Sequence, residues 1–292
     1  MIPVVRVLAP NPGPFTLEGT NTWVVGRDPA LVVDPGPDDA GHLLAVIDAA
    51  EPVEAILLTH NHPDHAPGAA RLAETTRVPV YTFRPQGEER RLRDGEVVEA
   101  GPLRLRAVHT PGHSPDHLAF LAEGEGLLFT GDAVLGRGTS IVDPPDGDMG
   151  AYMRSLRTMI ELRARTIYPG HGPVVFDAGG KLEEYLSHRT LREEQVIAAL
   201  GAGRATPEAM VPEIYGDEVS SSMFPAAERS VLAHLLKLER EERVARTVRG
   251  GQPRFTLVDP KPCERCGRPA RPGSRFCRRC ALAVLQEGPA AG

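Results

Sequence analysis

Four short apolar segments in the first 170 residues have the pattern of buried β-strands. They span residues 55–58, 103–108, 126–130 and 166–168. Continuous or alternating apolar runs of this length, ended by glycine, proline or polar residues, are typical of strands. Histidine or aspartate follows each segment within one to five residues. Because loops at strand ends commonly carry functional residues, the pattern predicts an α/β fold that presents these side chains at one edge of its sheets.

Seven potential metal ligands follow these strands. Four stand within six residues, at His60, His62, Asp64 and His65, and three come later, at His113, Asp132 and His171. Imidazole nitrogens and carboxylates are ligands of borderline divalent ions such as zinc. The alternative is a loop that is rich in histidine by chance, but this would not explain why so many ligand residues stand so close together. The set predicts a centre that holds two zinc ions.

The order His-x-His-x-Asp-His, followed by His, Asp and His on three later loops, resembles the metallo-β-lactamase superfamily. The resemblance implies an αββα sandwich and two zinc ions. One ion would be held by His60, His62 and His113, and the second by Asp64, His65 and His171, with Asp132 bridging them. Asp34 matches an early strand-end aspartate of the superfamily that orients ligands. A turn before Pro35 explains Asp34 equally well.

Two metal ions can lower the pKa of a shared water to about 7 and polarise the bond being broken. No serine or cysteine nucleophile is then needed, and the sequence has neither a Gly-x-Ser-x-Gly elbow nor a glycine-rich phosphate loop. We therefore expect metal-assisted hydrolysis. Asp64 and Asp132 are the predicted catalytic residues, because as ligands they would position the attacking water.

The segment after the last predicted ligand reads as three helices and a hairpin. Helical periodicity covers residues 181–200 and 225–242, and Thr206 followed by Pro207 is a good helix start between them. Two strand-like runs, 244–248 and 254–258, come next. This order predicts a small winged-helix domain. Since its third helix lacks a basic face, packing is at least as good an explanation for that helix as contact with nucleic acid.

All four cysteines lie near the C-terminus, in two Cys-x-x-Cys pairs formed by Cys263, Cys266, Cys277 and Cys280. Such pairs can supply a tetrahedral set of thiolates, and so short a segment has too little core to fold without a metal. One structural zinc is predicted, with disulfides as the alternative in an oxidising compartment. Residues 261–280 carry seven Lys or Arg against one Glu, whereas the whole chain has a net charge of −6. A basic knuckle of this kind suits nucleic acid or a protein partner.

These patterns predict the domain organisation. We expect a metallo-β-lactamase catalytic domain at 1–180, a winged-helix-like domain at 181–259, a zinc-ribbon-like knuckle at 260–283 and a disordered tail at 284–292. The N-terminus lacks a basic segment followed by an apolar core, and no apolar run approaches the length of a membrane span. We therefore expect a cytoplasmic protein with no membrane partner.

Residues 11–22, 131–136 and 168–173 resemble the β-lactamase-like protein branch of the superfamily, whose members add a winged helix to the sandwich. One member of that branch is similar to a single-strand-specific endoribonuclease, which implies cleavage of single-stranded RNA. A glyoxalase-II-like thioester hydrolase uses the same ligands and is the alternative. A non-catalytic scaffold that binds zinc and nucleic acid ranks third.

Two more residues are candidates for substrate contact. In the family pattern Asn21 would face the site, although a turn asparagine is the simpler explanation. His188 stands beside Arg189, and a His-Arg pair at a similar place recurs in thioester- and phosphoester-cleaving relatives. A plain helix surface is the alternative for His188.

Overall fold

The computed structural model describes residues 2–50, 52–216, 219–259, 262–268, 270 and 274–287. The chain divides into two compact units, Met1–Arg189 and Thr190–Gly292. Helix α4 (Ala178–Gly201) contains the point of division. The predicted domain boundaries after residues 180 and 259 stay predictions.

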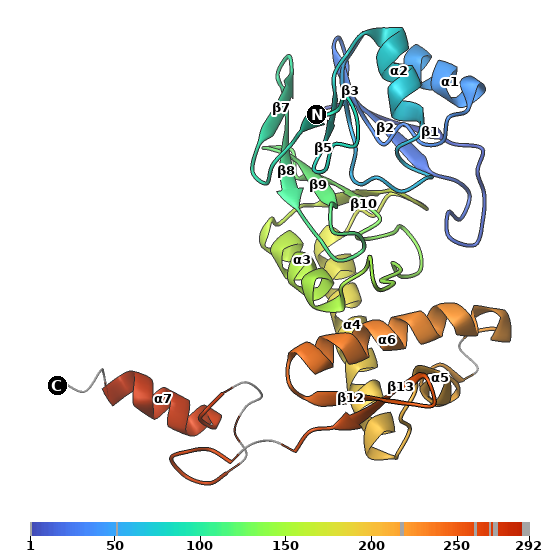
Figure 1. The fold of residues 1–292 in the computed structure, drawn as a ribbon. Helices are drawn as coiled ribbons and strands as arrows, with labels where there is room; N and C mark the ends of the chain where they lie inside the picture. Colours follow the sequence, from blue (N-terminus) through green and yellow to red (C-terminus); the bar gives the residue numbers. More distant parts are fainter. Residues whose placement is uncertain are drawn as a thin grey trace. The chain divides into compact units, whose positions relative to one another are not determined.

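Two β-sheets form the centre of the first unit. The first sheet has the order β1 (Val4–Leu8), β2 (Asn21–Gly26), β3 (Ala30–Val33), β4 (Val53–Leu57), β5 (Val80–Thr82) and β6 (Arg90–Arg91). The second has the order β11 (Thr166–Pro169), β10 (Leu127–Gly131), β9 (Leu118–Ala122), β8 (Leu103–His109) and β7 (Val97–Ala100). Helices α1 (Ala40–Ala50) and α2 (Gly68–Thr76) lie outside the first sheet, and α3 (Met149–Glu161) lies beyond the second (Figure 1). The predicted αββα sandwich is confirmed.

Alternation along the strands produces two layers of core. Leu31, Leu57 and Phe120 belong to the cluster between the sheets, to which both sheets contribute. Val32 and Ile56, the neighbours of the first two along the chain, belong instead to the cluster that α1 and α2 cover. Because successive side chains of a strand point to opposite faces, the near-continuous apolar runs of β3 and β4 fill both layers.

Parallel pairing places the ligand-bearing loops together. Strand β3 pairs in parallel with β4, and β10 pairs in parallel with β11, so the C-terminal ends of each pair lie at one edge. The two sheets approach closely there. At Gly131, which has φ +45°, an added Cβ would lie 2.5 Å from Oγ1 of Thr59. Glycine therefore lets the end of β10 meet the end of β4.

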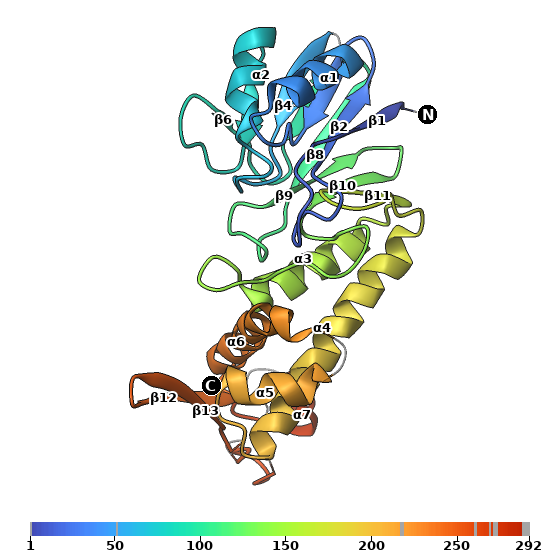
Figure 2. The ribbon, with the colours of Figure 1, turned by 90° about the vertical axis from the view of Figure 1, so that its right-hand side faces the viewer.

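The second unit is built from helices and a hairpin. It contains α5 (Pro207–Ile214), α6 (Phe224–Arg240), β12 (Val244–Arg249) and β13 (Gln252–Leu257), with a short 3₁₀ turn, Ser221–Met223, before α6. Figure 2 shows the hairpin beside α6. Thr206 caps α5 by accepting a hydrogen bond from the backbone of Ala209, and Pro207 occupies the first turn, as predicted. Leu200, Leu235 and Phe255 share one buried cluster, so the winged helix has its own core.

The polar side of α6 takes part in packing. Glu193, on α4, forms ion pairs with Lys237 of α6 and with Arg243, which precedes β12. Burial alone would raise the pKa of Glu193, but hydrogen bonds from His234 and Lys237 and their charges lower it to about 2. The Lys237 charge is therefore used within the unit, which is consistent with packing, one of the two explanations left open for this helix.

The C-terminal segment carries helix α7 (Arg278–Glu287). Of the tail predicted to be disordered, residues 284–287 belong to this helix and residues 288–292 lie outside the described residues. Among the described helices, none is both long and apolar enough to cross a membrane.

Candidate active site

The fold brings all seven predicted ligands together in two neighbouring groups. His60, His62 and His113 form the first group, and Asp64, His65, Asp132 and His171 form the second. Within each group, one ligand atom from every residue lies within 4.8 Å of the others. We call these the three-histidine group and the mixed group.

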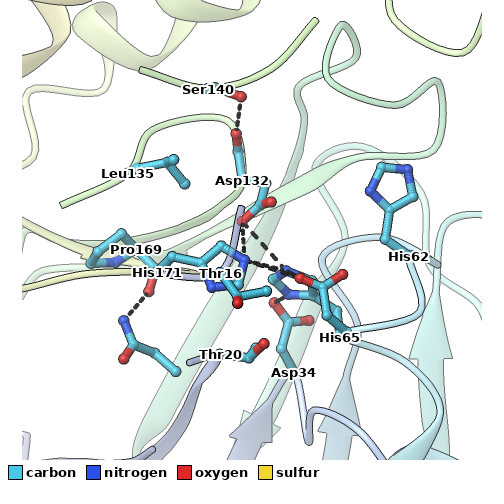
Figure 3. Close-up of polar contacts among 12 residues, drawn as sticks. Thr16, Thr20, Asp34, His62, His65, Asp132, Leu135, Ser140, Pro169 and His171 are labelled. Atoms are coloured by element: carbon cyan, nitrogen blue, oxygen red, sulfur yellow. Dashed lines mark hydrogen bonds and ion pairs between the residues drawn. The ribbon is translucent and has the colours of Figure 1, made fainter. Parts of the chain in front are cut away.

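Asp132 lies between the two groups. Its Oδ1 is 3.4 Å from Nε2 of His65 and 3.3 Å from Nε2 of His171. Its Oδ2 points the other way and is 3.7 Å from Nε2 of His113. Figure 3 shows the carboxylate directed at His171 and His65. With one oxygen toward each group, this carboxylate could contact an ion in either group.

The histidine nitrogens that face into each group are better placed to bind a metal ion than to hydrogen-bond to one another. Nδ1 of His62 and Nε2 of His113 are 3.0 Å apart, and Nε2 of His65 and Nε2 of His171 are 3.3 Å apart. Nε2 of His60 is buried and has no hydrogen-bond partner. Buried polar atoms normally have partners, and neutral imidazoles are good ligands for borderline divalent ions. The donor set therefore fits two divalent cations.

Asp34 supports one histidine of each group, one directly and one through Thr59. Its Oδ2 lies 2.9 Å from Nδ1 of His65 in the mixed group. The same oxygen accepts a hydrogen bond of 2.7 Å from the hydroxyl of Thr59, which is 2.9 Å from Nδ1 of His60. Thr59 also donates its backbone N–H to Oδ1 of Asp34. A single buried carboxylate thus touches one ligand directly and another through one hydroxyl.

Asn21 holds the turn that carries His171. Its side-chain nitrogen donates to the carbonyls of Pro169 and Gly172, each at 2.9 Å. Nδ1 of His171 is 3.1 Å from the carbonyl of Gly19, so the chain just before Asn21 also supports this ligand. The Asn21 nitrogen is bonded to the backbone of the turn and not to the ligand atoms.

A set of contacts that the sequence did not reveal holds the loop after Asp132. The hydroxyl of Tyr152, on α3, donates to the carbonyl of Ala133 at 2.7 Å. On α4, the hydroxyl of Tyr185 donates to Gly138 at 2.9 Å. Arg189 donates to the carbonyl of Ser140, whose hydroxyl bonds to the Asp132 carbonyl.

Arg189 is buried and also lies over the ring of Tyr152, with 5.3 Å from its guanidinium carbon to the ring centroid. His188, the neighbouring residue that was predicted to contact the substrate, is half buried on α4, and its role stays a prediction. The spacing of Tyr185 and Arg189, four residues apart on one helix, is the signal in the sequence that could have located this contact.

The two groups differ in electrostatics. Burial lowers the pKa of His60 well below its ordinary value, and the neighbouring His65 and His113 lower it further, so this imidazole is neutral. Burial would also lower the pKa of His171, but hydrogen bonds to Asp132 and Asp64 raise it to about 9. The carboxylates of the mixed group therefore favour positive charge beside them, in keeping with a divalent cation.

The four cysteines also form a cluster, in which the Sγ atoms lie within 4.8 Å of one another and no disulfide is present. The backbone N–H of Gly267 donates to the carbonyl of Cys263, and Gly267 has φ +70°, as a tight turn requires. Four thiol groups in reach of one point make a second, separate metal-binding set.

Comparison with known proteins agrees with this geometry. The family model described as the metallo-beta-lactamase superfamily matches residues 15–91 and 81–171. An atrochrysone carboxyl ACP thioesterase from Aspergillus chevalieri is 36% identical over 271 residues, covering 87% of this chain and 87% of that protein. The chain belongs to the metallo-beta-lactamase superfamily. It is a hydrolase of this fold with a metal-binding His/Asp site.

Other members support the assignment. The lactamase-like protein aptB from Emericella nidulans is 38% identical over 245 residues, with 76% of this chain and 77% of that protein covered. A beta-lactamase domain protein from Burkholderia ambifaria has the same fold, with a TM-score of 0.74 at 24% identity, over 87% of this chain and 91% of that chain. A model of the beta-lactamase associated winged helix domain matches residues 206–251. The four cysteines lie beyond both matched regions.

Proposed function

We propose that this hydrolase cleaves thioesters, with an acyl group carried on a pantetheine-like thiol as its substrate. The observation that carries the proposal is the similarity, over most of both chains, to proteins named as ACP thioesterases. None of the relatives named above is a ribonuclease. RNA cleavage, which the sequence placed first, is therefore not supported, and the thioester alternative fits better.

We assign His60, His62 and His113 to one zinc ion, and Asp64, His65 and His171 to the second, with Asp132 between them. When bound, the two ions would activate a water molecule and stabilise the negative charge that develops on the substrate oxygen. Asp64 and Asp132 would position that water through ligation and hydrogen bonding. The Asp64 side chain is 27% exposed and the Asp132 side chain 13%, so Asp64 faces the open side of the site.

The leaving group of a thioester suits this set of residues. A thiol has a pKa of about 8.5 and departs as a thiolate without a strong general acid. The alkoxide released from a phosphodiester needs a proton much more. The chain therefore requires only residues that hold the ions and the water for thioester cleavage.

The four cysteines we assign to one structural zinc ion. Four thiolates complete a tetrahedral set and leave no position for a substrate. The segment buries Cys263, Ala270 and Cys280 as its small core, which is too little for independent folding without a metal.

A parallel assay tests the proposal. The full chain, loaded with zinc, would be given an acyl-pantetheine thioester, S-lactoylglutathione and fluorescent single-stranded RNA. We expect thioester turnover that is lost in Asp64→Ala and kept in Glu99→Ala, a variant of an exposed glutamate on β7. RNA cleavage without thioester turnover would restore the nuclease hypothesis. Inactivity on all three substrates would favour the scaffold.

A further inference from the structure

His62 differs from the other four ligand histidines in its exposure. Its side chain is 34% exposed, whereas those of His65 and His171 are fully buried and that of His113 is 9% exposed. An exposed imidazole has more freedom to rotate, and a metal ligand that rotates holds its ion weakly. A further contact must fix the orientation of His62 if the three-histidine group is to hold its ion as tightly as the mixed group holds the other.

Each of the four buried histidines bonds an oxygen atom through the nitrogen that faces away from its group. The acceptor is the Thr59 hydroxyl for His60, the Asp34 carboxylate for His65, the Ile141 carbonyl for His113 and the Gly19 carbonyl for His171. Such partners fix both the tautomer and the plane of a ligand imidazole.

His62 completes this pattern through Asp146, a residue outside the two ligand groups. Its Nδ1 faces His113, and its outward Nε2 lies 3.1 Å from Oδ2 of Asp146. With the proton on Nε2 donated to this carboxylate, the lone pair of Nδ1 points into the three-histidine group. Asp146 lies 84 positions after His62, on the loop between β10 and α3.

The loop that carries Asp146 is held at two other points. Near its middle, the carbonyl of Ile141 accepts the hydrogen bond from His113 at 2.7 Å. At its end, Asp148 caps α3 through the backbone of Ala151 and donates its own N–H to the carbonyl of Gly112, next to His113. One loop thus contacts two of the three ligands of this group from outside.

The turn around Asp146 is also tight. The N–H of Gly147 donates to the carbonyl of Asp143 at 2.7 Å, and a Cβ added at Gly147 would lie 2.4 Å from the Asp143 nitrogen. No side chain fits there without movement of the backbone. The backbone position of Asp146 is therefore set by the loop itself, and the contact with His62 orients its side chain, which is 54% exposed.

We propose that Asp146 is a positioning residue for His62 and thereby sets how tightly the three-histidine group holds its ion. The proposal rests on the two-ion assignment made above and does not depend on the substrate. The mixed group is oriented by Asp34 and Gly19, so Asp146 acts on one of the two ions.

The test is a titration of metal-free full-length protein with Co²⁺, followed by absorption and calorimetry. Thiolate-to-cobalt charge transfer identifies the cysteine site, and the remaining absorption reports the two His/Asp groups. In Asp146→Ala we expect the affinity for one ion of the His/Asp site to fall about 10- to 100-fold, with the other ion and the cysteine site unchanged. Asp146→Asn keeps an acceptor oxygen and should lose less. Glu99→Ala is the matched control and should bind as the wild type does.

Unchanged affinity for all ions in Asp146→Ala would overturn the proposal. So would a fall in turnover with unaltered metal binding, because Asp146 would then act on the substrate and not through His62. If Asp146→Ala does not fold, Asp146→Asn decides, and equal loss of both His/Asp ions in that variant would also contradict the proposal. Since no substrate is present, failure of the thioester assay leaves these results unaffected.

Discussion

The two metal-binding clusters of this chain are built in opposite ways. The His/Asp cluster draws its ligands from loops between residues 60 and 171, and two sheets bring them together. The cysteine cluster lies within residues 263–280 and is shaped by its own turns. A site on a rigid scaffold can leave positions open for chemistry, because its geometry exists before the metal binds. A site that organises a short segment uses all its ligands for structure.

Removal of the Asp132 carboxylate, which faces both ligand groups, should have the largest effect on hydrolysis. Asp132→Ala takes away the oxygen atoms directed at both groups, so we expect hydrolysis to fall by about 10³-fold. The cysteine cluster should keep its ion, because no ligand there has changed. Steady-state kinetics and metal analysis measure the two effects. Hydrolysis within tenfold of the wild-type rate would show that Asp132 is not needed between the groups.

Asp34→Asn tests whether one carboxylate supports both groups. Asp34 has φ +51°, a conformation that asparagine also tolerates, so the variant removes charge with little backbone strain. We expect the affinities for both His/Asp ions to fall by about 10- to 100-fold. Cobalt titration measures them. If only the mixed group lost affinity for its ion, the contact from Asp34 to His60 through Thr59 would not contribute to metal binding.

A glycine pair tests how closely the His/Asp cluster is packed. A Cβ at Gly170 would lie 2.5 Å from Oδ1 of Asp132 and 2.8 Å from Cε1 of His65, so Gly170→Ala must displace ligands. We expect kcat to fall by about 10²-fold, the effect of a displacement near 1 Å. At Gly41 the nearest atom would be 3.4 Å away, and Gly41→Ala should leave kcat unchanged. Equal effects of the two substitutions would contradict the packing argument.

Cys266→Ser breaks the closed set of thiolates. We expect weaker thiolate-to-cobalt absorption, because only three thiolates remain, and faster proteolysis of the C-terminal segment, because the metal supplies its folding free energy. Turnover of acyl-pantetheine should stay at the wild-type rate. If turnover also fell, the two clusters would depend on each other. That result would contradict the view that each cluster is built independently.

Glu193→Gln should have the smallest effect on hydrolysis, since it acts in the winged-helix unit. The folded-state pKa of Glu193 is about 2, below its ordinary 4.5, so its stabilisation is present above pH 4.5 and is lost as the pH falls toward 2. The variant should lack this acid dependence. It should also be less stable near neutral pH by about 3 kcal/mol, because Lys237 loses a buried partner.

Two probes separate the units in that experiment. Fluorescence of Trp23, the single tryptophan of the chain, follows the first unit. Hydrogen exchange along α6 follows the second. Identical acid dependence of α6 protection in wild type and variant would contradict the role of Glu193.

Local spacing in the sequence is enough to predict much of this protein. The ligand residues can be recognised from the sequence. The C-terminal ends of paired parallel strands must lie at the same edge of a sheet. The run from His60 to His65 and the later His113, Asp132 and His171 can therefore be placed together from the sequence alone. The two Cys-x-x-Cys pairs are local in the same sense. Helix α3 is absent from the sequence predictions, although Asp148 before an amphipathic stretch is a start signal.

The ligands are the same for thioesters and RNA, so they do not determine the substrate class. The relatives favour thioesters over RNA, the reverse of the order that the sequence predicted.

Tertiary structure alone decided what surrounds the ligands. The Asp146 carboxylate reaches His62 across 84 positions, and Arg189 reaches Ser140 across 49. Asn21 turned out to hold the backbone around His171. These contacts depend on where whole loops fold over the sheet edge, and loop conformation follows from packing and backbone hydrogen bonds between distant segments. Residue type and spacing determine which atoms can bind a metal, whereas their orientation is set by neighbours that only the folded chain brings near.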